Sequence, residues 1–192
     1  MTKSVDWTAL EKLLADEATR LLRDFATNHR AHEFYGAIFD VEPYDGCFVH
    51  LRLNTEAHLT AEYDEPVAPD DLHRRFLPGA FAHKLKLSNV DGFPGDRIEQ
   101  LVEADIDTDE LDEDGLYKTT ASLLETVCRV AEALERGPLQ QLRRTSDFTI
   151  SVTPDAREPG ELGVARYSKF KKRRNAERRS SPALIVKPKP GI

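Results

Sequence analysis

Six polar side chains occur within nine residues of this chain, where a strand-like pattern gives way to a helix-like one. They are His50, Arg52, Asn54, Thr55, Glu56 and His58. Because polar and apolar residues alternate along the strand pattern, His50 and Arg52 face away from Leu51, toward solvent or a ligand. The N-terminus of the following helix would add backbone N–H donors that bind anions. The segment therefore predicts a small-ligand or catalytic site. The structural alternative is a helix cap at Asn54-Thr55 and an ion pair between Arg52 and an acid.

A second candidate is an acidic run, in which eight of the twelve residues from Glu103 to Asp114 are Asp or Glu. A calcium loop of the EF-hand type needs a glycine at position 6 and a glutamate at position 12. Loops that begin at Asp105 or Glu110 place Leu116 or Ala121 at position 12, so both registers fail. We predict a solvated acidic loop or a partner-binding surface rather than a metal site. The residues assigned to that surface are Asp105, Asp107, Asp109, Glu110 and Asp112.

The sequence contains no familiar catalytic or cofactor motif, since it lacks GxSxG, a Walker loop and GxGxxG. Its six histidines include no HxxxH or HExxH pair, so we predict no metal and no cofactor. The two cysteines, Cys47 and Cys128, lie at the start of a strand pattern and within an apolar helix face. We therefore expect reduced packing residues rather than a disulfide or a nucleophile.

Charge is divided unevenly along the chain. Eight basic residues and one acid lie between Arg166 and Arg179, a net charge of +7. Because the whole chain carries −7, the remaining residues carry −14. A basic segment of this kind can bind nucleic acid or an anionic membrane. Few aromatic residues interrupt it, however, and the acidic body would oppose docking on DNA. We therefore predict a poorly ordered, basic, Pro-containing tail over 168–192.

Apolar periodicity predicts two long amphipathic helices, over 5–29 and 117–136, the second ended by Gly137-Pro138. Strand patterns over 33–41 and 47–54 flank a turn and predict a β-hairpin. Shorter elements are expected after the Asn54-Thr55 cap (a helix), around Ala80–Leu87 (a strand), near Arg97–Glu103 (a helix) and over 148–153 (a strand).

These elements predict an α+β fold, with a mixed or antiparallel sheet, a central hairpin and both long helices packed on one face of the sheet. A single domain would then cover residues 1–167. The N-terminal residues lack the continuous apolar stretch of a secretory signal, and no run of eighteen apolar residues occurs. We therefore expect a cytoplasmic protein.

The order of these segments resembles an uncharacterised bacterial family, the domain of unknown function with serial number four-three-zero-three. The resemblance is carried by Phe34, Tyr35, Phe39 and the tetrapeptide Leu53-Asn54-Thr55-Glu56, and it extends over about residues 5–167. It implies a single-domain cytoplasmic protein with no established activity. Some related small α/β families neutralise secreted toxins by binding them.

Two functional hypotheses follow. The first is a non-enzymatic protein-binding module, with an immunity-type inhibitor of a basic partner as its specific form, because an acidic surface speeds encounter with a basic one. The alternative is a small-ligand binder or an enzyme with its polar site at the end of the 47–54 strand. A pocket at His50–His58 would favour the alternative, and a flat surface there would favour the first hypothesis.

Overall fold

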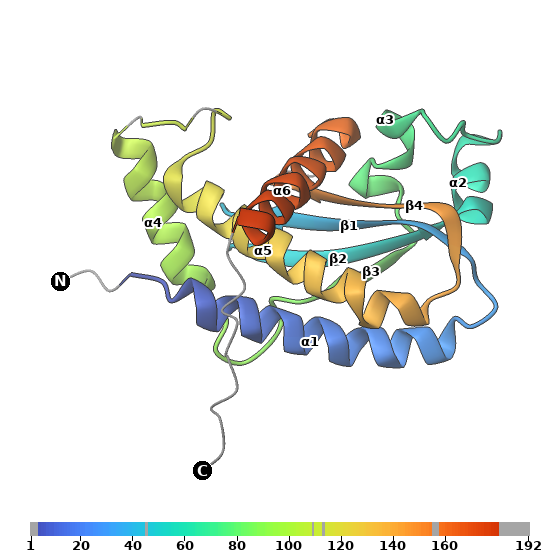
Figure 1. The fold of residues 1–192 in the computed structure, drawn as a ribbon, viewed down its shortest axis with the longest axis horizontal. Helices are drawn as coiled ribbons and strands as arrows, with labels where there is room; N and C mark the ends of the chain where they lie inside the picture. The colour runs from blue at the N-terminus through green and yellow to red at the C-terminus, as the bar shows by residue number, and fades with distance from the viewer. Residues whose placement is uncertain (1–3, 45, 109, 113, 155–157, 181–192) are drawn as a thin grey trace, which may run out of the picture.

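A four-stranded mixed sheet forms the centre of the protein in the computed structural model (Figure 1). The structure describes residues 4–44, 46–108, 110–112, 114–154 and 158–180. The strands are β1 (Phe34–Glu42), β2 (Phe48–Thr55), β3 (His83–Lys86) and β4 (Arg144–Thr153), in the order β3-β2-β1-β4. β2 pairs antiparallel with β1 and β3, whereas β4 pairs parallel with β1. The predicted hairpin is therefore confirmed, and it occupies the two central positions of the sheet.

Helices surround this sheet. They are α1 (Trp7–Asn28), α2 (Glu56–Tyr63), α3 (Leu72–Arg75), α4 (Gly95–Thr108), α5 (Lys118–Arg136) and α6 (Gly160–Ser180), with 3₁₀ turns η1 (Pro78–Ala80) and η2 (Pro138–Gln141). The side chain of Asp6 caps α1 by accepting hydrogen bonds from the backbone N–H groups of Thr8 and Ala9. Among the described residues, no helix is long and apolar enough to cross a membrane.

The larger hydrophobic core lies between the sheet and the two long helices. α1 and α5 pack against each other, as Figure 1 shows, and their buried leucines meet Val49, Leu51 and Leu53 of β2. The predicted α+β fold, with both long helices on one face of the sheet, is thereby confirmed. A smaller core on the opposite face holds Tyr35 and Ile38 of β1.

The predicted basic tail is wrong for residues 168–180, which continue α6 as part of the fold (Figure 1). The proposed domain boundary after Tyr167 therefore falls inside a helix. Tyr167 and Phe170 lie three residues apart on one face of α6 and are buried in the larger core. The helix approaches β4 so closely that a Cβ atom at Gly163 would lie 2.2 Å from the hydroxyl of Ser151. Residues 181–192, the remainder of the predicted tail, lie outside the described part of the chain.

The acidic run also differs from the predicted loop. Its first six residues, from Glu103 to Thr108, form the last turns of α4 rather than a connection. The helix extends past the predicted end at Glu103, and neither glycine nor proline occurs between Glu103 and Thr108 to end it earlier. Of the remaining acids, the described ones, Glu110, Asp112 and Asp114, lie between α4 and α5.

Candidate functional site

The polar side chains of β2 make structural interactions. Arg52 contacts the buried carboxylate of Asp40 on β1, with its Nε and Nη2 atoms 2.8 and 2.6 Å from Oδ2. His50 is also buried, and its Nδ1 atom lies 3.8 Å from the same oxygen, beyond hydrogen-bonding distance. Burial alone would raise the pKa of Asp40, but interactions with His50 and Arg52 outweigh it and lower that pKa. This arrangement agrees with the predicted ion pair of Arg52.

Asn54 is fully buried and connects three parts of the fold. Its side-chain NH₂ group donates to Tyr35 Oη at 3.1 Å and to the Ala80 carbonyl at 3.0 Å. Its Oδ1 atom accepts from the backbone N–H of Thr55 at 3.0 Å. A buried amide with this many protein partners has little capacity left for a ligand.

Thr55 and Glu56 serve the start of α2. Thr55 Oγ1 accepts a hydrogen bond from the backbone N–H of His58 at 3.2 Å, as the predicted helix cap requires. Glu56 pairs with the buried guanidinium of Arg75 at 2.5 Å, and that guanidinium also lies over the ring of Tyr35. The six predicted ligand-binding residues are thus distributed among a strand face, a buried hydrogen-bond network and a helix cap.

Asn54→Ala should lower the free energy of unfolding by about 2–4 kcal/mol, because it removes the hydrogen bonds of a buried amide to the Ala80 carbonyl, the Tyr35 hydroxyl and the Thr55 N–H. A urea melt measures this change, and Thr60→Ala, on the exposed side of α2, is the matched control. An Asn54→Ala protein as stable as the control would show that this network contributes little, and would return Asn54 to the set of candidate ligand-binding residues.

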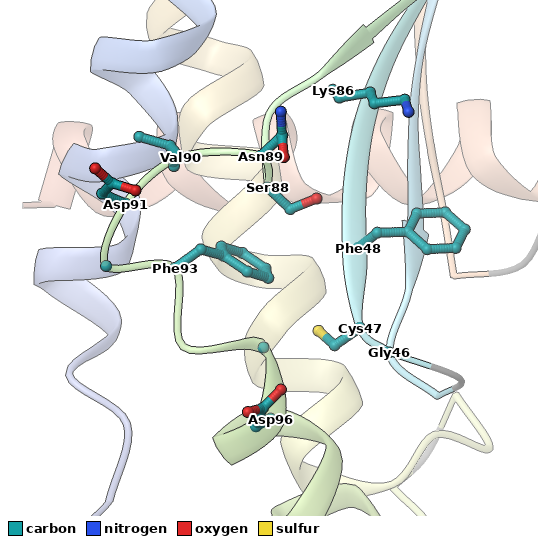
Figure 2. Close-up of a pocket in the computed structure, with 12 residues that line it drawn as sticks. Gly46, Cys47, Phe48, Lys86, Ser88, Asn89, Val90, Asp91, Phe93 and Asp96 are labelled. Carbon is teal, nitrogen blue, oxygen red and sulfur yellow. The ribbon is translucent and has the colours of Figure 1, made fainter.

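A hollow of about 420 Å³ opens beside the start of β2 (Figure 2). Lys86 lies at one side of it and Asp91 and Asp96 at the other, while Cys47 and Phe93 line its interior. None of the six predicted ligand-binding residues lines this hollow. Burial raises the pKa of the Cys47 thiol to about 12, so Cys47 is not a thiolate nucleophile at neutral pH. Both cysteines are free and buried in the larger core, as predicted.

Several carboxylates of the acidic run stabilise the connection between α4 and α5. Asp105 Oδ2 accepts from the backbone N–H of Thr119 at 2.6 Å, at the N-terminus of α5. Asp112 Oδ1 accepts from the N–H groups of Asp114 and Leu116, each at 2.9 Å. Two of the five residues assigned to the partner-binding surface therefore have structural roles.

Part of the acidic run forms an exposed surface. Asp107 and Glu110 are exposed, whereas Asp109 lies outside the described residues. Two large apolar side chains are exposed among these acids: Ile106 at 41% and Leu111 at 53% of their full accessible area. We call Ile106, Asp107, Glu110 and Leu111 the acidic–apolar surface. Isolated apolar side chains are common on protein surfaces, but two within an acidic run are notable.

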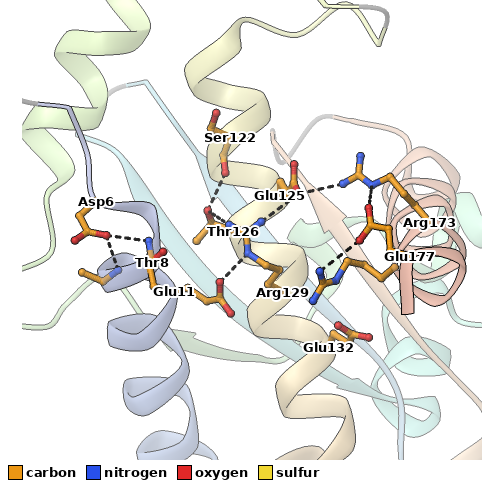
Figure 3. Close-up of polar contacts among 12 residues, drawn as sticks. Asp6, Thr8, Glu11, Ser122, Glu125, Thr126, Arg129, Glu132, Arg173 and Glu177 are labelled. Atoms are coloured by element: carbon orange, nitrogen blue, oxygen red, sulfur yellow. Dashed lines mark hydrogen bonds and ion pairs between the residues drawn. The ribbon is translucent and has the colours of Figure 1, made fainter. Parts of the chain in front are cut away.

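The charge division of the sequence is partly neutralised within the fold, because the basic half of α6 lies against acids of α5. Lys171 pairs with Glu135 at 2.8 Å, Arg173 with Glu125 at 3.1 Å and Arg178 with Glu132 at 3.3 Å. Figure 3 shows Glu125 between Arg173 of α6 and Arg129 of α5. These acids of α5 therefore form ion pairs with basic residues of the same chain, while the acidic–apolar surface retains exposed carboxylates.

Three histidines that are not among the predicted site residues lie together at the C-terminal end of α1. His29 caps the C-terminus of α1, His32 lies in the connection to β1, and His83 begins β3. One ring nitrogen from each lies within 4.8 Å of the other two. Burial and the neighbouring histidines lower the pKa of His83 to about 4, and burial lowers that of His29. The spacing His29-x-x-His32 at the end of the predicted helix was the available signal, but the third histidine lies 51 residues after His32.

The described residues form an α+β fold with a four-stranded mixed sheet. No family model, no curated protein and no solved structure matches the chain. The resemblance to the family of unknown function stays a prediction.

Proposed function

We propose that this protein is a non-enzymatic binding module whose acidic–apolar surface docks on a basic protein. The observation that carries the proposal is the exposure of Ile106 and Leu111 among carboxylates. Protein interfaces commonly combine apolar contacts at the centre with charged residues at the rim. Here the apolar side chains would provide the buried contact, and Asp107 and Glu110 would steer and orient a partner of opposite charge.

The specific form of this proposal is a cytoplasmic immunity-type inhibitor that covers the basic surface of a toxin, such as a nuclease. The acidic net charge and the resemblance to the family of unknown function support this form. The alternative, a ligand site at the end of β2, has less support because Arg52, Asn54 and Glu56 are engaged with Asp40, Tyr35 and Arg75.

A charge-reversal experiment tests the proposal. The partner is captured from the source cells with the wild-type chain and identified, and its binding kinetics are then measured at several salt concentrations. Asp107→Lys/Glu110→Lys should slow association by roughly ten-fold or more and change dissociation less, because these charges act during encounter. Leu111→Ser should instead speed dissociation, because it removes an apolar contact that the bound partner would bury.

The matched control is Asp24→Lys/Glu62→Lys, which changes the net charge equally at exposed positions on α1 and α2. This control should reduce association only slightly. Equal slowing by both double variants would reduce the effect to net charge. An acidic partner, or full-speed association with the Asp107→Lys/Glu110→Lys variant, would contradict the proposal.

A further inference from the structure

We propose that His29, His32 and His83 form a binding site for one divalent transition-metal ion of the Zn²⁺ class. This inference is independent of the proposed partner-binding function, because the histidines lie at the end of α1 and the start of β3, whereas the acidic–apolar surface lies on α4 and the α4–α5 connection.

The spacing of the ring nitrogens fits such an ion. The Nδ1 atoms of His29 and His32 are 3.2 Å apart, and the ligating nitrogens of all three rings lie within 4.8 Å of one another. Two imidazole nitrogens bound tetrahedrally to Zn²⁺ at about 2.0–2.1 Å are about 3.3 Å apart. The His29–His32 pair already has this separation, and small rotations of the His83 ring would bring the third nitrogen to the same distance.

Aromatic packing holds the rings in place. The ring of Phe25 stacks on His29 with centroids 4.1 Å apart and meets the His83 ring edge-on at 5.1 Å. The ring centroid of Phe34 lies 5.9 Å from that of His83 and 6.3 Å from that of His32. These contacts restrict the rotations of the imidazoles, so that less conformational entropy is lost when an ion binds.

The donor set selects the class of metal. Three imidazoles without a carboxylate or thiolate favour Zn²⁺, Cu²⁺, Ni²⁺ and Co²⁺ over Ca²⁺ and Mg²⁺, which prefer oxygen ligands. Each imidazole would bind the ion through the lone pair of one ring nitrogen.

The position of the site gives metal binding a structural consequence. Within the described part of the chain, β3 is an edge strand of four residues whose one neighbour in the sheet is β2. An ion held by His29, His32 and His83 would tie this strand to the C-terminal end of α1. Metal binding should therefore stabilise the fold, since an ion that binds only the native state shifts the unfolding equilibrium.

The experiment uses the full chain without a histidine tag. Zn²⁺ binding is measured by isothermal titration calorimetry, and Co²⁺ reports the ligand geometry by its visible absorption. We expect one Zn²⁺ per chain, a tetrahedral Co²⁺ spectrum, and a rise of roughly 5–10 °C in Tm at a Zn²⁺ concentration of about 100 times Kd. At the same Zn²⁺ concentration, His83→Gln and His32→Gln should each weaken Zn²⁺ binding by at least about ten-fold and reduce the rise in Tm to about half or less.

His73→Gln is the matched control, because His73 is exposed on α3 and pairs with Glu161 instead of the other histidines. It should bind Zn²⁺ as the wild type does. His32 is exposed, so His32→Gln keeps the test valid if His83→Gln fails to fold. Failure of the wild type to bind Zn²⁺ or Co²⁺, or equal affinity in the His32→Gln and His73→Gln variants, would overturn the proposal.

Discussion

Leu51→Asp should remove cooperative folding at 25 °C. Leu51 is fully buried in β2, between β1 and β3, and its side chain belongs to the larger core under α1 and α5. Its replacement removes a buried leucine, which costs about 2–5 kcal/mol, and also places a carboxylate in an apolar region without a cation. The combined loss matches the whole stability of an ordinary domain, about 5–15 kcal/mol.

Leu162→Asp provides the matched control for this substitution. Leu162 is 50% exposed in the first turn of α6, where a carboxylate also complements the helix dipole. We expect its unfolding free energy to stay within about 0.5 kcal/mol of the wild type. Circular dichroism and thermal melts of both variants make the comparison. A Leu51→Asp protein that melts cooperatively at the wild-type midpoint would contradict the assignment of this core.

The alternation of β2 shows which parts of the fold could be predicted from the sequence. Val49, Leu51 and Leu53 recur at every second position, and the leucines of α1 and α5 recur at three and four, so each element carries its own signal for the face it buries. The same local signals placed the cap at Thr55 and the end of α5 at Gly137. Such features depend on neighbours in the sequence.

The candidate sites depended on neighbours in space. His50 and Arg52 face away from Leu51, as the alternation predicts, but His50 is buried instead of facing solvent. The sequence could not show that Asp40 of β1 would lie beside both side chains. Likewise, His83 joins His29 and His32 only because β3 runs along the hairpin to the end of α1. The hydrogen bond of Asp105 to Thr119 depends on how α4 meets α5.

The basic segment illustrates the same limit for charge. Considered alone, the residues after Tyr167 have too few apolar side chains to bury and repel one another, which is the usual pattern of a disordered tail. Their countercharges are Glu125, Glu132 and Glu135, one helix earlier. With these charges paired, Phe170 packs in the larger core, where α6 lies against α5 and β4.

Truncation after Tyr167 should therefore lower Tm by roughly 10–15 °C relative to a chain that ends at Ser180. The comparison isolates residues 168–180. Loss of the buried Phe170 ring costs about 3–5 kcal/mol by itself. The eight residues of α6 that remain are too few to form a stable helix without their contacts, and the buried Glu132 loses its ion pair with Arg178.

Two substitutions in the full chain separate these contributions. Phe170→Ala should reproduce most of the loss in Tm, because the apolar contact outweighs exposed ion pairs of about 0.2–1 kcal/mol each. Lys172→Ala, at an exposed position on the same helix, should leave Tm nearly unchanged.

If the truncated chain melted within a few degrees of the chain ending at Ser180, the contacts of α6 with α5 would be too weak to hold residues 168–180 in the fold. The acids Glu125, Glu132 and Glu135 would then add to the charge available to a basic partner, so this melt also decides how much of the acidic body can act in binding.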